Sequence, residues 1–342
     1  MNTLIELKKI TSPFVIVLVL ACFALLQKVH AVSPAPDGGY ANGNTAEGTN
    51  ALFNLTTGVR NTANGYLALA FDTTGRYNTA VGSQALYSNT TGVANTASGN
   101  AALFHNTVGG DNTATGFGAL NSNTTASNNT ANGYKALFNN TTGSSNTANG
   151  AAALLDNSTG GDNTASGIYA LVSNTSGSWN TAGGSGALES NTMGSYNTAV
   201  GFHALLSNTG ANGNTAVGYQ ALYNVSDPTF GGFNVAVGFY AGADVTGIGN
   251  VAIGSNAYGE AGVNYTTWIS NVYASVATNR AVYVNADNKI GTLSSSRRYK
   301  DEIKSMDKAS ETLFALNPVT FRYKKKIDPS RALSFGGSRK AM

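Results

Sequence analysis

The side chains that most often perform chemistry in proteins are few in this sequence and lie far apart. The chain has three histidines, His30, His105 and His203, and one cysteine, Cys22. Scattered histidines without cysteine partners do not form a zinc site. Two Gly-Gly-Asp-Asn runs resemble calcium-binding repeats, but they lack the G-G-x-G-x-D spacing. Paired carboxylates, a Walker loop and a nucleotide fingerprint are absent from the sequence, so we expect neither a metal nor a cofactor.

The composition argues against an ordinary globular enzyme. Charged residues make up 11% of the 342 residues, and 41 residues are glycine. Typical soluble domains have about 25% charged residues and about 7% glycine. Too few large apolar side chains remain to fill one thick core, while the pattern is too regular for a disordered chain. We therefore expect a thin, repetitive core.

The N-terminus has the features of an export signal. Lys8 and Lys9 precede an uncharged apolar run from Phe14 to Leu26, and Val29-His30-Ala31 ends in small residues suited to cleavage after Ala31. The run is shorter than the roughly 20 residues of a bilayer span, although an uncleaved N-terminal anchor is the alternative. The sequence thus predicts an extracytoplasmic protein, secreted or held at the cell surface.

Charge is divided unevenly along the chain. Residues 32–255 carry three basic and nine acidic side chains, a net of −6, whereas residues 280–342 carry fourteen basic and six acidic ones, a net of +8. A basic segment can indicate nucleic-acid binding. The export signal argues against that partner, so we interpret this segment as a solvated, charged C-terminal module.

An internal repeat dominates the middle of the chain. Each copy reads N-T-A-x-G-x-x-A-L-x-x-N-T-T-G-x-x, with Ala at positions 3 and 8, Gly at position 5 and Leu at position 9 in all eleven copies. The tripeptide Asn-Thr-Ala recurs every 17 residues, beginning at Asn44, Asn61, Asn78, Asn95, Asn112, Asn129, Asn146, Asn163, Asn180, Asn197 and Asn214. Looser copies follow at Asn234 and Asn250.

A repeat of 17 residues is too short for a helical hairpin and suits one coil of a parallel β-solenoid. We expect a strand over N-T-A-x-G and a second strand over A-L-x-x, with the glycines at positions 5 and 15 in the turns. Coils stacked about 4.8 Å apart would align Asn and Thr in ladders and Leu in an apolar spine. The fold class predicted is therefore all-β, with a small α+β module at the C-terminus.

A single rod of this kind buries little apolar surface in each coil. One buried Leu contributes about 1.5–3 kcal/mol, whereas ordering each backbone residue costs about 1–2 kcal/mol. Association of several rods would add burial, and the aromatic residues at positions 6 and 10 are candidates for the contact. These are Phe53, Tyr66, Tyr87, Phe104, Tyr134, Phe138, Tyr219 and Tyr223.

The repeat resembles the head repeats of trimeric autotransporter adhesins, whose N-x-V-A-I-G units build a three-chain β-roll. Asn250 to Gly254 reads NVAIG and matches that unit. The 17-residue copies are longer than the usual unit of that family, so the resemblance covers architecture and not register. It implies a homotrimer.

The repetition stops near Val263. Ala281–Val284 and Lys289–Thr292 read as two strands joined by a turn. Residues 305–316 have a helical spacing of apolar side chains that ends before Pro318, and Val319–Tyr323 alternates as a strand.

This segment resembles the intramolecular chaperone domain that ends endosialidase-type phage tail spikes and fibres, a self-cleaving peptidase family. The resemblance rests on the S-x-x-R-x-K-x-x-I run from Ser295, on the helix expected after it and on Leu316 to Phe321. It implies trimerisation and a catalytic dyad, with Ser295 as nucleophile and Lys300 as base, whose pKa desolvation would lower. Two departures count against cleavage: Ser296 stands where the family often has Asp, and the family pattern stops after Gly336. We therefore expect a shortened module with an inactive dyad.

The chain divides into a signal peptide (1–31), a linker (32–43), the repeat solenoid (44–259), a β connector (260–293) and the chaperone-like module (294–342). The predicted function is an exported structural or adhesive fibre that binds itself and a glycan or other surface. One alternative is binding to ice or another crystal through a hydroxyl array of Thr45, Thr62, Thr79 and their equivalents. The other is an enzyme whose only substrate is its own chain.

Overall fold

The computed structural model describes residues 40–226 and 232–270, together with two short strands at 282–284 and 290–292. The predicted signal peptide and the predicted chaperone-like module, including Ser295 and Lys300, lie outside the described residues. The repeat region and the two C-terminal strands fall into separate units, Met1–Ser275 and Val276–Met342.

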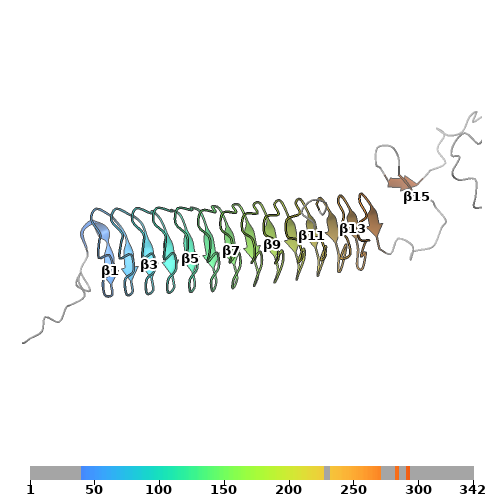
Figure 1. The fold of residues 1–342 in the computed structure, drawn as a ribbon. Helices are drawn as coiled ribbons and strands as arrows, with labels where there is room; N and C mark the ends of the chain where they lie inside the picture. Colours follow the sequence, from blue (N-terminus) through green and yellow to red (C-terminus); the bar gives the residue numbers. More distant parts are fainter. Residues whose placement is uncertain (1–39, 227–231, 271–281, 285–289, 293–342) are drawn as a thin grey trace, which may run out of the picture. The chain divides into compact units, whose positions relative to one another are not determined.

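Fourteen three-residue strands form one parallel sheet in chain order, with one strand in each coil of a β-solenoid (Figure 1). A short 3-10 helix, η2 (Ala41–Gly43), precedes the first strand. The strands are β1 (Thr45–Glu47), β2 (Thr62–Asn64), β3 (Thr79–Val81), β4 (Thr96–Ser98), β5 (Thr113–Thr115), β6 (Thr130–Asn132), β7 (Thr147–Asn149), β8 (Thr164–Ser166), β9 (Thr181–Gly183), β10 (Thr198–Val200), β11 (Thr215–Val217), β12 (Val235–Val237), β13 (Val251–Ile253) and β14 (Thr267–Ile269). The predicted all-β solenoid is confirmed.

Equivalent residues of successive coils pair directly. Thr45 of β1 is opposite Thr62 of β2, and the same register continues through Thr198 and Thr215. The step lengthens to 20 residues between β11 and β12 and shortens to 16 after β12, yet the strand positions remain aligned. The ladder also includes β14. The solenoid therefore continues past residue 259, where the recognisable sequence repeat ends. Fourteen strands at about 4.8 Å give a rod of roughly 60 Å.

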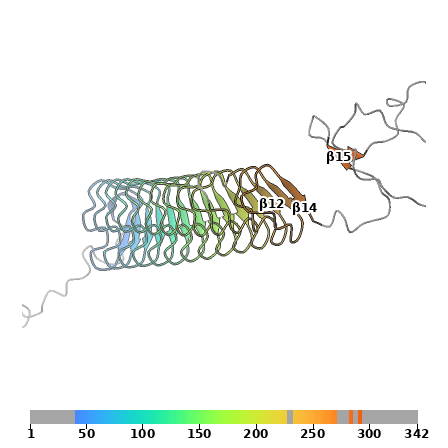
Figure 2. The same ribbon diagram turned by 45° about the vertical axis from the view of Figure 1, so that its right-hand side comes forward.

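Each coil encloses a narrow core filled by five side chains. The two alanines at positions 3 and 8 and the leucine at position 9 are buried, as in the coil with Ala131, Ala136 and Leu137. The asparagines at positions 1 and 12 complete that core, and they are buried as well. Figure 2 shows the coils stacked one on another along the rod. The predicted leucine spine and asparagine ladder are therefore present.

The buried asparagines form two columns. In the first column, at position 1, each Oδ1 accepts the backbone N–H of the next equivalent Asn, as between Asn129 and Asn146 at 2.9 Å. From Asn44 to Asn197 each Nδ2 donates across the coil to a carbonyl 14 residues later, as from Asn146 to Gly160 at 2.9 Å. The second column, at position 12, links side chain to side chain, as from Asn157 Nδ2 to Asn140 Oδ1 at 2.7 Å. These bonds satisfy buried polar groups that would otherwise destabilise so thin a core.

The predicted second strand over A-L-x-x is wrong. This segment is a turn in every coil, because the leucine at position 9 has a left-handed backbone, with φ between 50° and 55° in the eleven copies. The left-handed bend turns the chain while Leu remains in the core. Adjacent coils still bond there, as from Leu137 N to Ala153 O at 3.0 Å.

Glycine recurs at positions 5 and 15 of the repeat for two different reasons. At position 5, φ lies between 119° and 145° in the eleven copies, a range that strongly favours glycine. At position 15 no glycine has a positive φ, and the constraint is instead the close approach of the next coil, whose carbonyl lies where a Cβ would be. Ala126 and Ala211 occupy position 15 in two coils and are buried there. The expected turn conformation is thus found at position 5 alone.

The C-terminal unit contains one described element, an antiparallel pair of β15 (Val282–Val284) and β16 (Ile290–Thr292). Val282 is opposite Thr292, and Val284 is opposite Ile290. The prediction of two strands is confirmed for these residues, and the predicted turn between them lies outside the described residues. The predicted helix at 305–316 lies outside the described residues.

Candidate binding surfaces

The outward face of the parallel sheet carries a column of threonines. The Thr at position 2 is exposed or half-buried in each of β1 to β11, while the Ala beside it points into the core, as Thr130 and Ala131 do in β6. No hydrogen bond of the described residues uses the hydroxyl of any of these threonines, whereas the Thr at position 13 donates its hydroxyl to the next coil, as Thr90 does to Thr107 O at 3.0 Å. The sheet therefore presents a row of hydroxyls with about 4.8 Å between neighbours, free to bind water or a ligand.

The same face becomes apolar at its C-terminal end. Position 4 is polar or small in most coils up to β9, as at Asn132 and Asn149. From β10 onward the residue at position 4 is aliphatic and 38–45% exposed. We call this set the apolar end of the sheet: Val200, Val217, Val237, Ile253 and Ile269. Because exposed apolar patches mark contact sites more often than chance allows, this end is a candidate interface.

The aromatic residues predicted at positions 6 and 10 divide into two groups. Phe53, Tyr66, Tyr134 and Tyr219 are exposed, whereas Tyr87, Phe104, Phe138 and Tyr223 are half-buried. Neighbouring rings stack along the rod, as Tyr87 and Phe104 do with centroids 4.8 Å apart. Phe202, Tyr219 and Phe239 form a second stack, at 5.4 and 5.2 Å. These stacks stabilise contacts between coils and expose ring edges.

A third aromatic position was missed from the sequence. Position 17, two residues before each strand, holds Tyr77, Trp179, Tyr196, Phe233 and Tyr265, which are 50–79% exposed. All five have a left-handed backbone, with φ between 52° and 61°. The signal was the same 17-residue spacing, but no sequence rule indicates that this position points outward.

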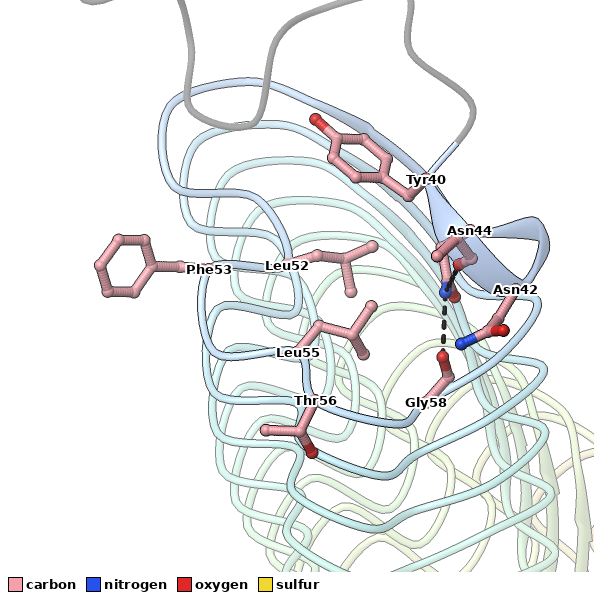
Figure 3. Close-up of a pocket in the computed structure, with 9 residues that line it drawn as sticks. Tyr40, Asn42, Asn44, Leu52, Phe53, Leu55, Thr56 and Gly58 are labelled. Carbon is pink, nitrogen blue, oxygen red and sulfur yellow. Dashed lines mark hydrogen bonds between the residues drawn. The ribbon is translucent and has the colours of Figure 1, made fainter.

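The N-terminal end of the rod contains a hollow of about 370 Å³ (Figure 3). The core is open there, because no coil precedes β1 among the described residues. Tyr40, Leu52 and Leu55 line the hollow, and Phe53 points away from it. Asn44 donates from Nδ2 to Gly58 O at 2.9 Å and closes one side. The residues that line the hollow include neither an acid–base pair nor a nucleophile beside a base.

The described residues contain no cluster of three or more potential metal ligands. His203 lies 3.9 Å from Glu189 and stacks on Phe202, while His105 packs edge-on against Phe104. The candidate catalytic pair, Ser295 and Lys300, lies outside the described residues and stays a prediction.

One acidic side chain is buried inside the rod. Asp72 occupies position 12, where the following coils have Asn, and it is fully buried. Its Oδ1 accepts from Asn89 Nδ2 at 2.8 Å, and its Oδ2 accepts from Asn61 Nδ2 at 3.2 Å. Burial raises the pKa of Asp72 to about 6, although the bonds from Asn89 and from the Gly75 backbone oppose the increase.

Comparison with protein-family models, curated proteins and solved structures found no match to this chain. In the described part of the chain, no helix has the length and hydrophobicity that a bilayer span requires.

Proposed function

We propose that this protein is an exported structural and adhesive fibre that works outside the cytoplasm. The observation that carries the proposal is the in-register ladder of fourteen strands, whose outward face repeats from coil to coil. Solenoids of this kind act through long, extended surfaces. The charged and apolar residues before Ala31 support export, as expected for a cleaved signal peptide.

The proposed assembly is a homotrimer of parallel rods. Support comes from the apolar end of the sheet, which exposes aliphatic side chains over five successive coils. Support also comes from the resemblance of residues 294–336 to a trimerising chaperone domain, for which we propose self-processing at Ser295 with Lys300 as base. Parallel copies in register would bring these modules together at one end of the fibre.

Sedimentation equilibrium tests the assembly. We expect the mature chain to be trimeric at micromolar concentration and Ile253→Lys to shift it toward monomer, because a lysine would place three like charges in one apolar contact. Asn132→Lys adds the same charge to the same sheet face outside the apolar end and should remain trimeric. A stable, folded monomer of the unaltered chain would exclude the trimer.

Binding to ice or another crystalline surface is a second candidate function. The specific observation in its favour is the row of unbonded hydroxyls at position 2, from Thr45 to Thr215, at a constant spacing. The purified repeat region should then show thermal hysteresis, and Thr130→Lys with Thr147→Lys should reduce it by interrupting the row. A freezing point equal to the melting point in the unaltered protein removes ice from the candidates.

A further inference from the structure

An alternation of aromatic residues and glycine runs along one edge of the rod. Two residues before each strand from β10 to β14, the chain has Tyr196, Gly213, Phe233, Gly249 and Tyr265. All five have a left-handed backbone and occupy equivalent places in successive coils. The aromatic residues therefore recur at every second coil.

The three aromatic side chains are among the most exposed in the described part of the rod. Tyr196 is 62% exposed, Phe233 66% and Tyr265 79%. The ring of Phe233 lies 2.8 Å from the place a Cβ would take at Gly213, and the ring of Tyr265 lies 2.6 Å from the corresponding place at Gly249. The rings of Phe233 and Tyr265 thus rest across the glycine of the preceding coil, which a larger residue would prevent, whereas Tyr196 stacks on Trp179 of the coil before it.

The spacing of the rings is fixed by the sheet. Two steps between parallel strands correspond to about 9.6 Å. Tyr196, Phe233 and Tyr265 precede β10, β12 and β14, so they form a row of anchors at this interval. The row and the apolar end of the sheet lie at different repeat positions, 17 and 4.

Two amide groups flank the rings. Asn212 precedes Gly213 and accepts the backbone N–H of Ser195 on its Oδ1 at 2.7 Å. Asn264 precedes Tyr265 and accepts the backbone N–H of Ile248 on its Oδ1 at 2.9 Å. Both side chains are exposed, and no hydrogen bond of the described residues uses their Nδ2 groups. The backbone bonds fix each amide and leave its N–H donors for a ligand.

We propose that this aromatic row, Tyr196, Phe233 and Tyr265 with the amides of Asn212 and Asn264, binds an extended β-1,4-linked polysaccharide. Such a chain has apolar C–H faces that stack on aromatic rings, and hydroxyls that accept hydrogen bonds from amides. Its disaccharide repeat is close in length to two coil steps, so successive disaccharides meet successive rings. The inference rests on the adhesive function proposed above and names its ligand class.

A proline-rich peptide is the competing ligand, since it also has a repeat near 9 Å. Such peptides dock into grooves lined by aromatic side chains. Here the rings stand exposed on an edge of the rod, and Tyr265 has most of its surface free. An exposed edge suits the flat surface of a polysaccharide, which needs no enclosing walls.

Pull-down of the full secreted chain on microcrystalline cellulose and on chitin tests the inference. We expect binding to at least one of them, and at least about tenfold weaker binding for Phe233→Ala with Tyr265→Ala, because aromatic anchors dominate such contacts. Phe53→Ala removes an equally exposed ring near β1 and should bind as the unaltered chain does. Circular dichroism checks that each variant folds, and Tyr265→Ala alone serves if the double variant does not.

A soluble cello-oligosaccharide gives an independent measurement, because Trp179 stacks on Tyr196 with centroids 4.9 Å apart. The fluorescence of Trp179 should change when the oligosaccharide is titrated into the protein, and a polyproline peptide should leave this fluorescence unchanged. Failure to bind either polysaccharide, loss of binding in Phe53→Ala, or binding of polyproline in place of the sugar would each overturn the inference. A monomeric rod that binds cellulose would contradict the trimeric fibre alone, and a trimer that binds neither polysaccharide would contradict this inference alone.

Discussion

Gly150→Ala is expected to break the rod near its middle. Gly150 has a φ of 139°, where a Cβ is strained, and a Cβ there would lie 2.5 Å from the carbonyl oxygen of Gly167 and 2.7 Å from its carbon. Both atoms belong to the backbone of the next coil, which bonds to its neighbours on both sides, so neither can move away cheaply. We expect the free energy of unfolding to fall by about 4 kcal/mol or more, because backbone strain and a steric clash act together.

Gly160→Ala is the matched control in the same coil. It adds the same methyl group at position 15, where φ is not left-handed. A Cβ there would lie 2.3 Å from the carbonyl oxygen of Gly177, an approach that the coils with Ala126 and Ala211 accommodate. We expect it to cost about 1–3 kcal/mol, less than Gly150→Ala, because the close approach acts there without backbone strain. Hydrogen exchange of the amides of Gly150 and Gly167, which bond to Asn132 and Asn149, should accelerate in Gly150→Ala alone. Equal protection in both variants would show that position 5 tolerates a side chain.

The repeat length was enough to predict the solenoid and its register. Identical residues recur from Asn44 to Asn214, so stacking the coils places like on like, and a slip by one residue would expose the Ala and Leu columns. The burial of Ala131 between exposed Thr130 and Asn132 confirms the alternation. Asn at position 1 was predicted to form a ladder, and its bonds from coil to coil confirm this.

Backbone conformation was predicted less well, because it depends on neighbouring coils. Leu is apolar and favours regular structure, so a left-handed Leu137 has no signal in a single repeat. The structure imposes it because the chain must turn while that side chain stays in the core. The same reason accounts for position 17, where Trp179 and Tyr196 read as ordinary apolar residues and yet lie exposed.

The second amide column has a direction, and Asp72 stands at one end of it. From Asn89 to Asn208, each Nδ2 donates to the Oδ1 of the preceding coil, at 2.7–3.1 Å. The N–H ends of the column thus point toward the carboxyl group of Asp72. At the other end, Asn208 Oδ1 has no partner among the described residues, because Val225 occupies the next coil. Asp72 therefore terminates this polar column inside the core, beside Asn61 of the first column.

The stability of the rod should depend on pH through this group. Burial raises the pKa of Asp72 from 3.8 to about 6 in the folded protein. The folded state therefore binds the proton more tightly than the unfolded state does. This contribution is fully present below about pH 4 and is lost as the pH rises through about 6. The difference between the two pKa values corresponds to roughly 3 kcal/mol.

Asp72→Asn should remove this part of the pH dependence and make the rod more stable than the unaltered protein at pH 8. An amide at residue 72 cannot ionise, and it can donate to Gly75 O as Asn89 does to Gly92 O at 3.3 Å. Urea unfolding of both proteins at several pH values between 4 and 8 measures the effect, and the difference between them isolates Asp72 from every other acid. Parallel curves for the two proteins would mean that Asp72 stays ionised in the folded rod and that the amide column, and not the solvent, compensates its charge.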